Sequence, residues 1–270
     1  MFDYHIHTNH SSDSKSSMES MIRAAYNAGL KEISITDHAD FSFPKQEFLN
    51  LDFDLDAYIN EIGHLRQKYA DKICVLAGIE MGIRDDLAQK IGDIAKSYDF
   101  DIIIGSLHDF EGLDFGMDFD YGSFFAGRDK NTAYGQYFEI LLDSVAAVND
   151  FDILGHMDYI ERYAPYPNRI LKYANHAEII DEILKILIGK GKGIEINTAG
   201  YAYGLNHSHP QIEIVRAYRR LGGEIITIGS DAHNPQRIGA DFDKAIDMLK
   251  AVGFKYITKF RNRIPEMVAL

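Results

Sequence analysis

The chain has little of what marks secreted, membrane-spanning or nucleic-acid-binding proteins. It has one cysteine, Cys74, so no disulfide can form within the chain, which is typical of a reducing compartment. It has no run of about 18 apolar residues and no basic segment leading into an apolar one at its start. Basic residues are also few, because 28 Lys and Arg stand against 41 Asp and Glu, giving a net charge of −13. We therefore expect a cytoplasmic protein that binds neither a membrane nor nucleic acid.

No feature of the composition divides the chain into parts. Its 6 prolines are scattered, and it has no low-complexity tract or Pro/Gly-rich linker, so we expect one domain over residues 1–270. Hydrophobic residues make up 46% and charged residues 26%, which excludes a disordered chain. The sequence carries no signal for the oligomeric state.

Short apolar, β-branched runs alternate with amphipathic segments along the chain. The runs are Tyr4–His7, Glu32–Thr36, Ile73–Ile79, Asp101–Gly105, Asp152–Leu154, Gly193–Ile196 and Glu224–Ile228, with a weaker eighth at Phe254–Ile257. Such runs are typical of parallel strands buried on both faces, and the segments between them have the period of helices. The first helix is predicted to begin with a capping box at Ser16 and Glu19. Seven or eight such units favour a closed α/β barrel over an open sheet.

The placement of the histidines is the most informative feature. Six histidines and two acids end or follow the predicted strands: His5, His7, His38, Glu80, His108, His156, Asp231 and His233. In a parallel barrel these positions meet at the carboxyl-terminal rim, where active sites are built. One such histidine alone would more often be a hydrogen-bonded structural residue, but the set has the ligand types of zinc, manganese and iron sites. Because alternate strand residues share a face, His5 and His7 can reach one ion, so the pattern predicts a metal centre.

Three further histidines lie in loops. His10 follows the His5 and His7 pair closely, as a ligand or as a neighbour of the ligands. His207 and His209 fall in a loop before Pro210, where we expect surface residues rather than lining of the pocket mouth.

The ordered motifs resemble a known family. They are His5-Ile-His7-Thr8, Thr36-Asp37-His38, Gly78-Ile79-Glu80, Gly105-Ser106-Leu107-His108, Gly155-His156-Met157-Asp158 and Ser230-Asp231-Ala232-His233. Together they resemble the polymerase and histidinol phosphatase (PHP) superfamily, and Glu195-Ile-Asn197-Thr198-Ala199-Gly200 is similar to its histidinol-phosphatase branch. The resemblance implies a distorted (βα)7 TIM-like barrel with two or three divalent ions, zinc, manganese or iron, at the carboxyl-terminal rim.

The resemblance also implies how the ligands are shared. A first ion would be held by His5, His7, Glu80 and Asp231, and Glu80 would bridge to a second ion held by His108 and His156. A third ion would be held by His38, His233 and a residue of the loop after His7. For that last ligand we expect Asp13, with His10 as the alternative.

The activity that the resemblance implies is hydrolysis of a phosphate monoester. The expected reaction is that of a histidinol-phosphatase in histidine biosynthesis, in which metal-activated hydroxide attacks L-histidinol phosphate. The cationic clamp on the phosphoryl group would be Arg162, which as a lone residue could also be a surface arginine. Asp231 or His233 would pass a proton to the leaving oxygen. Further substrate contacts are expected from Ser106, Asn197, Tyr201 and Arg128.

The chain departs from the family pattern at one point. An arginine is expected just after Asn-Thr-Ala-Gly, where this chain reads Tyr201-Ala202-Tyr203. Either Arg128, Lys130 or Arg237 takes its place, or phosphate affinity is lower, or the alanine is an engineered exchange. In the long loop between Ser106 and Asn131, Glu111, Asp114, Phe115, Asp118 and Tyr121 are candidate contacts for a substrate amine.

Two other functions remain open at this point. One is a PHP phosphoesterase that acts on nucleotides or other small phosphate esters. The other is a metal-binding module without catalysis, which the competent side chains at all eight strand-end positions disfavour.

Overall fold

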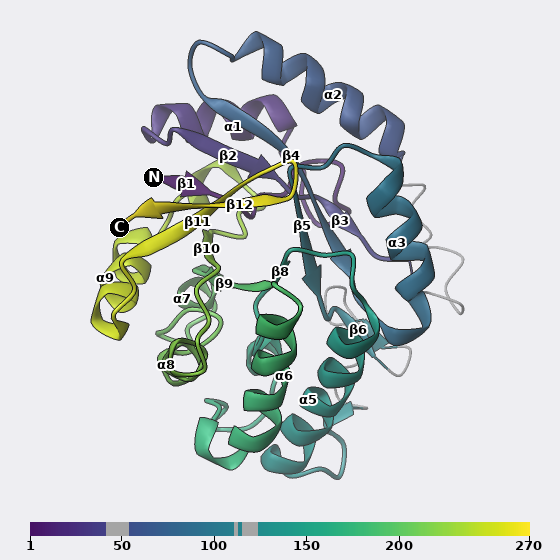
Figure 1. The fold of residues 1–270 in the computed structure, drawn as a ribbon, viewed down its shortest axis with the longest axis vertical. Helices are drawn as coiled ribbons and strands as arrows, with labels where there is room; N and C mark the ends of the chain where they lie inside the picture. Colours follow the sequence, from purple (N-terminus) through teal and green to yellow (C-terminus); the bar gives the residue numbers. More distant parts are fainter. Residues whose placement is uncertain (42–53, 111–112, 115–123) are drawn as a thin grey trace.

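Parallel strands wind into a nearly closed barrel in the computed structural model, which describes residues 1–41, 54–110, 113–114 and 124–270 (Figure 1). Its seven strands in the described part of the chain are, in spatial order, β1 (Phe2–Asp3), β2 (Glu32–Ile35), β4 (Cys74–Gly82), β5 (Ile102–Ser106), β8 (Ile153–Leu154), β9 (Gly193–Asn197) and β10 (Ile226–Gly229). Backbone contacts join the two ends of this sheet: the Tyr4 amide donates to the Ile228 carbonyl (3.2 Å). The predicted (βα)7 barrel is confirmed.

A short strand beyond the end of β2 brings one histidine into register with the third strand along the sheet. This strand, β3 (His38–Ala39), pairs in parallel with β4, so that His38 lies opposite Glu80. The pairing of β2 with the same strand ends at Ile35 opposite Ala77, and the chain between carries Asp37. Because the pairing with β4 is interrupted between Ile35 and His38, the residues that follow β2 turn polar side chains toward the barrel rim.

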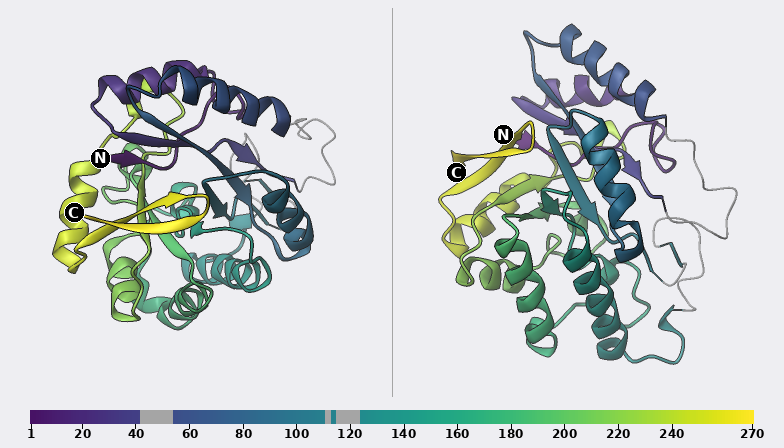
Figure 2. Two further views of the ribbon diagram at one scale, coloured as in Figure 1. Left: turned by 45° about the horizontal axis from the view of Figure 1, so that its top comes forward. Right: turned by 45° about the vertical axis from the view of Figure 1, so that its right-hand side comes forward.

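Helices connect the strands and surround the barrel (Figure 2). They are α1 (Met18–Asn27), α2 (Leu55–Lys68), α3 (Ala88–Ser97), α5 (Lys130–Ala147), α6 (Ala177–Gly189), α7 (Ala199–Ala202), α8 (Ile212–Arg220) and α9 (Phe242–Val252), with 3-10 turns η1 (Asp85–Leu87), η2 (Tyr159–Arg162), η3 (Tyr173–Asn175) and η4 (Pro235–Arg237). The predicted cap at Ser16 is wrong by one residue. Ser17 caps α1 by accepting from the Ser20 amide, because the Ser16 hydroxyl donates instead to the His233 carbonyl. None of the helices within the described ranges is both long and apolar enough to cross a membrane.

A carboxyl-terminal hairpin covers the amino-terminal end of the barrel. Its strands are β11 (Tyr256–Arg261) and β12 (Ile264–Ala269), and they pair in antiparallel fashion. Phe260 packs with side chains inside the barrel, and Arg263 pairs with Asp152 (3.1 Å). The weak eighth run is therefore part of this hairpin and not a barrel strand. With the amino end covered, the carboxyl ends of the strands form the accessible rim.

The predicted long loop after β5 has local structure at its start. A short antiparallel pair, β6 (Asp109–Phe110) and β7 (Leu113–Asp114), lies there. The side chains expected to contact a substrate amine, those of Glu111, Asp114, Phe115, Asp118 and Tyr121, lie outside the described part of the structure.

A candidate metal centre at the carboxyl ends of the strands

One buried carboxylate, that of Glu80 on β4, lies at the middle of the histidine cluster. Its Oε2 atom lies 3.2 Å from His5 Nε2, 3.6 Å from His7 Nε2 and 2.9 Å from His38 Nδ1. Its Oε1 atom lies 3.2 Å from His108 Nε2 and 3.0 Å from His156 Nε2. The two oxygens thus face two different groups of imidazoles. This division matches the bridging role that the family resemblance implies for Glu80.

Asp231 completes the first of these groups. It follows β10, and its Oδ1 atom lies 3.1 Å from His7 Nε2 and 3.7 Å from His5 Nε2. The backbone at Asp231 has a φ of 52°, and at His156 of 21°, values that non-glycine residues rarely adopt. Such unusual backbone at two strand ends is typical of positions where side-chain direction matters more than local stability.

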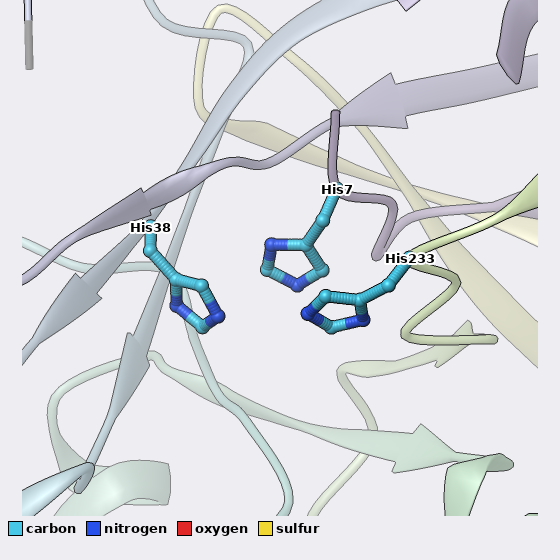
Figure 3. Close-up of side chains that lie close together, drawn as sticks. All are labelled: His7, His38 and His233. Atoms are coloured by element: carbon cyan, nitrogen blue, oxygen red, sulfur yellow. The ribbon is translucent and has the colours of Figure 1, made fainter. Parts of the chain in front are cut away.

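A third group lies beside the first and includes Asp13. The rings of His38 and His233 both stack near that of His7, with centroids 4.2 and 4.1 Å from it (Figure 3). Asp13 Oδ2 lies 2.8 Å from His233 Nε2 and 3.6 Å from His38 Nε2. His10 instead approaches Glu61, with 2.8 Å between its Nε2 and the carboxylate Oε2. The structure therefore brings Asp13, and not His10, to the cluster.

The donor atoms of the cluster are poorly satisfied by one another. Within the described residues, His5 Nε2, His7 Nε2, His38 Nδ1, Glu80 Oε2 and His233 Nε2 are buried and make no hydrogen bond of suitable geometry, although oppositely charged atoms lie close to them. Buried polar atoms nearly always have one, so five converging exceptions need another partner. Several sets of three donors lie close enough together to coordinate one ion, among them His5, His7 and Glu80. Imidazole nitrogens with carboxylate oxygens fit zinc, manganese or iron.

The electrostatics of the cluster suit a cation. Burial and the neighbouring imidazoles of His233 and His38 lower the pKa of His7 to about 3, which keeps this ring neutral. Burial opposes ionisation of Glu80, but the imidazoles of His5, His108 and His38 hold its pKa well below the usual range. The pKa of Asp231 is held low in the same way, chiefly by His5 and His7. Against the effect of burial, the same carboxylates raise the pKa of His108 to about 10 and hold the pKa values of His5 and His38 above the usual range, so a metal ion at these rings would displace protons.

A second set of acids holds the cluster in place, and the sequence did not identify it. Glu195 on β9 lies 2.7 Å from His5 Nδ1 through Oε1, and its Oε2 accepts from the His156 amide (3.2 Å). Asp40 Oδ1 lies 3.0 Å from His108 Nδ1. Carboxylates of this kind fix the ring orientation of ligand histidines. The available signal for Glu195 was an acid within an otherwise apolar, buried strand.

Asp37 acts in a similar way on the loop after β1. Its carboxylate accepts from the Thr8 amide (2.6 Å) and from the Ser11 hydroxyl (2.6 Å). The Ser11 oxygen lies 3.1 Å from His7 Nδ1. A chain of polar contacts therefore runs from a buried acid to a ring at the centre of the cluster.

The side chains expected to contact the substrate mostly bond or pack with other groups of the protein. The Ser106 hydroxyl donates to Glu80 (2.6 Å), and the Asn197 amide is engaged by Glu195 and by the Ala199 backbone. Arg128 lies over Phe124 and donates to its carbonyl, and the Tyr201 ring packs under Lys244. Each of these four side chains has a partner within the protein, and their roles as substrate contacts stay predictions. The two other candidates for the missing arginine are also engaged, Lys130 by backbone carbonyls and Arg237 by Asp241.

Arg162 remains as the candidate cation at the rim. It ends η2, which follows β8 and His156 in the chain, and its guanidinium contacts Tyr159, Tyr163 and Tyr203. Burial opposes its charge, but the surrounding tyrosines and Asp231 raise its pKa, so it stays protonated. The Tyr159 ring that it contacts also stacks on the ring of His156, with 4.3 Å between centroids, which places Arg162 near the cluster.

His209 is corrected from a surface residue to a buried one, and His207 is half-buried. His209 Nδ1 lies 2.5 Å from Asp158 Oδ1, and His207 Nε2 lies 3.2 Å from Glu161 Oε2. The loop turns inward because Asn197 and His209 exchange two backbone hydrogen bonds (2.7 and 2.8 Å). These pairs hold the segment between His156 and Arg162.

Known proteins are similar to this chain in both sequence and fold. The family model of the PHP domain matches residues 3–199. The chain is 33% identical to a histidinol-phosphatase of Lactococcus lactis over 96% of its length and 93% of the relative, and 34% identical to a probable histidinol-phosphatase of Clostridium acetobutylicum over 94% and 95%. A crystal structure of the Lactococcus lactis histidinol phosphate phosphatase, complexed with zinc, L-histidinol and phosphate, has a TM-score of 0.88 at 32% identity and covers 98% of both chains.

The pair of half-buried His207 and buried Glu161 predicts a pH-dependent stability. Burial alone would lower the pKa of His207, but Glu161 and Asp158 raise it to about 9, and burial raises the pKa of Glu161. His207 holds its proton more tightly in the folded state, so its contribution to the free energy of unfolding falls as pH rises from 6.5 through 9. Relative to a His207→Gln, Glu161→Gln double variant, the native protein should lose about 1–3 kcal/mol over this range.

This prediction is checked by urea unfolding at pH 6.5, 8 and 9.5 at one fixed zinc concentration. His64→Gln, at an exposed position on α2, serves as the control and should parallel the native protein. A difference between the native protein and the double variant that does not change with pH would contradict the assignment.

Proposed function

The chain belongs to the PHP family, and from this premise we propose that it is a metal-dependent phosphomonoesterase that hydrolyses L-histidinol phosphate to L-histidinol and phosphate. The observation that carries the proposal is the pair of donor groups joined by Glu80, in a chain of which 98% matches a histidinol phosphate phosphatase in structure. The protein acts in the cytoplasm as one domain over residues 1–270. Its role is a step of histidine biosynthesis.

The centre holds two or three divalent ions, with zinc, manganese and iron as the suitable metals. His5, His7, Glu80 and Asp231 hold the first, and Glu80 with His108 and His156 holds the second. His38, His233 and Asp13 hold the third. The buried nitrogens described above, which make no hydrogen bond of suitable geometry, support this assignment. When bound, divalent ions here offset the charge of the phosphoryl oxygens and lower the pKa of water.

The side chains of the chain orient the ester and move a proton. Arg162 binds two phosphoryl oxygens through its fork of N–H donors, and it carries this task without a second arginine at position 202. Asp231 serves first as a metal ligand. Asp231 or His233, whose Nδ1 lies 3.6 Å from Asp231 Oδ1, passes a proton to the leaving oxygen.

The proposal is tested by phosphate release from L-histidinol phosphate, a nucleoside monophosphate and 4-nitrophenyl phosphate, with metal-replete protein. We expect kcat/KM for L-histidinol phosphate to exceed the others by more than about a hundredfold, nearly 3 kcal/mol of discrimination. His156→Ala should abolish release, which excludes a contaminating phosphatase. Activity on the other esters alone would contradict the proposed substrate. No activity on any ester would contradict the proposal that the protein is a phosphatase.

Asp13 and His10 make opposite predictions for metal content. Asp13→Ala should lower the number of bound ions by about one per chain, since it lies 2.8 Å from His233 Nε2. His10→Ala should leave the number unchanged, because His10 pairs with Glu61 away from the cluster. Elemental analysis of gel-filtered protein measures both variants. The reverse result would move the third ion to His10.

A further inference from the structure

The Arg162 guanidinium is packed among three tyrosine rings. Its Cζ atom lies 3.4 Å from the centre of the Tyr203 ring, and 5.4 and 5.2 Å from those of Tyr159 and Tyr163. Nη2 donates to the Tyr203 hydroxyl, and Nη1 donates to the Tyr159 hydroxyl (3.4 Å). The distance to Tyr203 is within the range of a cation–π contact.

The two stacked side chains come from different strand ends. Arg162 ends η2 after β8, whereas Tyr203 follows α7 after β9. Arg169 joins the two segments, because Nη1 donates to the Arg162 carbonyl (3.0 Å) and Nη2 to the Tyr203 carbonyl (2.5 Å). Arg169 is itself held, since its own carbonyl accepts from the Tyr134 hydroxyl on α5 (2.5 Å). The backbone of both segments is therefore fixed, and with it the stack.

The other side of the guanidinium leads to the metal centre. The Tyr159 ring stacks on that of His156, with centroids 4.3 Å apart and planes 27° apart. The Tyr159 hydroxyl also lies 2.8 Å from that of Tyr163. Contacts thus run from a proposed ligand through Tyr159 to Arg162 and on to Tyr203, which is 40% exposed.

We propose that Tyr203 is a positioning residue for the phosphatase reaction, whose ring fixes the Arg162 guanidinium beside the metal centre so that it meets the phosphoryl group without reorientation. The inference rests on the proposed function. An arginine side chain has many rotamers in water, and ordering it only when the substrate binds would weaken its effect. A single arginine held in place by stacking performs the task in a chain that has alanine at position 202.

A double-mutant cycle on kcat/KM for L-histidinol phosphate tests the inference. Tyr203→Leu removes the ring and should lower kcat/KM by about tenfold, whereas Tyr203→Phe keeps the ring and should lose less than about threefold. In an Arg162→Lys background, where no flat guanidinium remains to be stacked, Tyr203→Leu should change kcat/KM by less than about twofold. Tyr256→Leu on the exposed side of β11 is the matched control and should have no effect.

Two results would overturn the inference. If Tyr203→Leu caused the same loss in both backgrounds, Tyr203 would act independently of Arg162. If Tyr203→Leu caused no loss, the stack would be without consequence for the reaction. Equal melting temperatures of the Tyr203 variants and the native protein would show that the fold is intact in the comparison.

A measurement without turnover separates this inference from the proposed function. A ring at this distance shifts the Arg162 Nε–H resonance, so Tyr203→Leu should move that signal and Tyr203→Phe should not. Inorganic phosphate should also bind about tenfold more weakly to metal-replete Tyr203→Leu than to the native protein. If the native protein hydrolysed no ester, the proposed function would fail and these two readouts would decide the inference. An unmoved signal with unchanged phosphate affinity would overturn it.

Discussion

The buried carboxylate of Glu80 is the constraint on which the rest of the site depends. A charge without solvent is costly unless it is paired, and Glu80 lies within 3.6 Å of imidazoles from His5, His7, His38, His108 and His156. His5 and His7 come from one strand end and the other three from separate strand ends, and the closed parallel barrel brings these ends to one point. Glu195, Asp37 and Asp40 then fix the rings from behind. The metal centre therefore depends on the closed barrel to bring its ligands together.

The charges explain why the chain combines metal ions with Arg162. Its net charge of −13 and the carboxylates of the centre repel an anionic ester. Cations bound at the cluster reverse this repulsion locally, and Arg162 adds the directed hydrogen bonds that a spherical ion does not supply. A small monoester can use such a local site. A long polyanion would meet the acidic surface around it.

The sequence predicted the parts of the site that depend on strand ends, and missed those that depend on the path of loops. His38 and Glu80 could be placed together because parallel strands end at one rim, as β3 and β4 do. His207 could not be placed, because no periodicity records that its loop turns under the barrel rim. The position of Ser106 after a strand predicts a contact with the substrate, yet a hydroxyl can form its hydrogen bond equally well with a substrate or with Glu80. The cap at Ser17 and the hairpin at β11 show the same limit, since neighbouring serines and short apolar runs fit two local structures.

The central claim is that Glu80 joins two metal-binding groups, and the number of ions bound by Glu80→Gln tests it most directly. The matched control is Glu61→Gln, which changes another glutamate beside a histidine, 2.8 Å from His10 Nε2. Elemental analysis of both proteins after gel filtration should find at least one ion fewer per chain in Glu80→Gln, and the native number in Glu61→Gln. In Glu80→Gln, kcat should also fall by more than about a hundredfold, because the lost ion would no longer offset the charge of the phosphoryl group. A Glu80→Gln protein with the native number of ions and native activity would contradict the account.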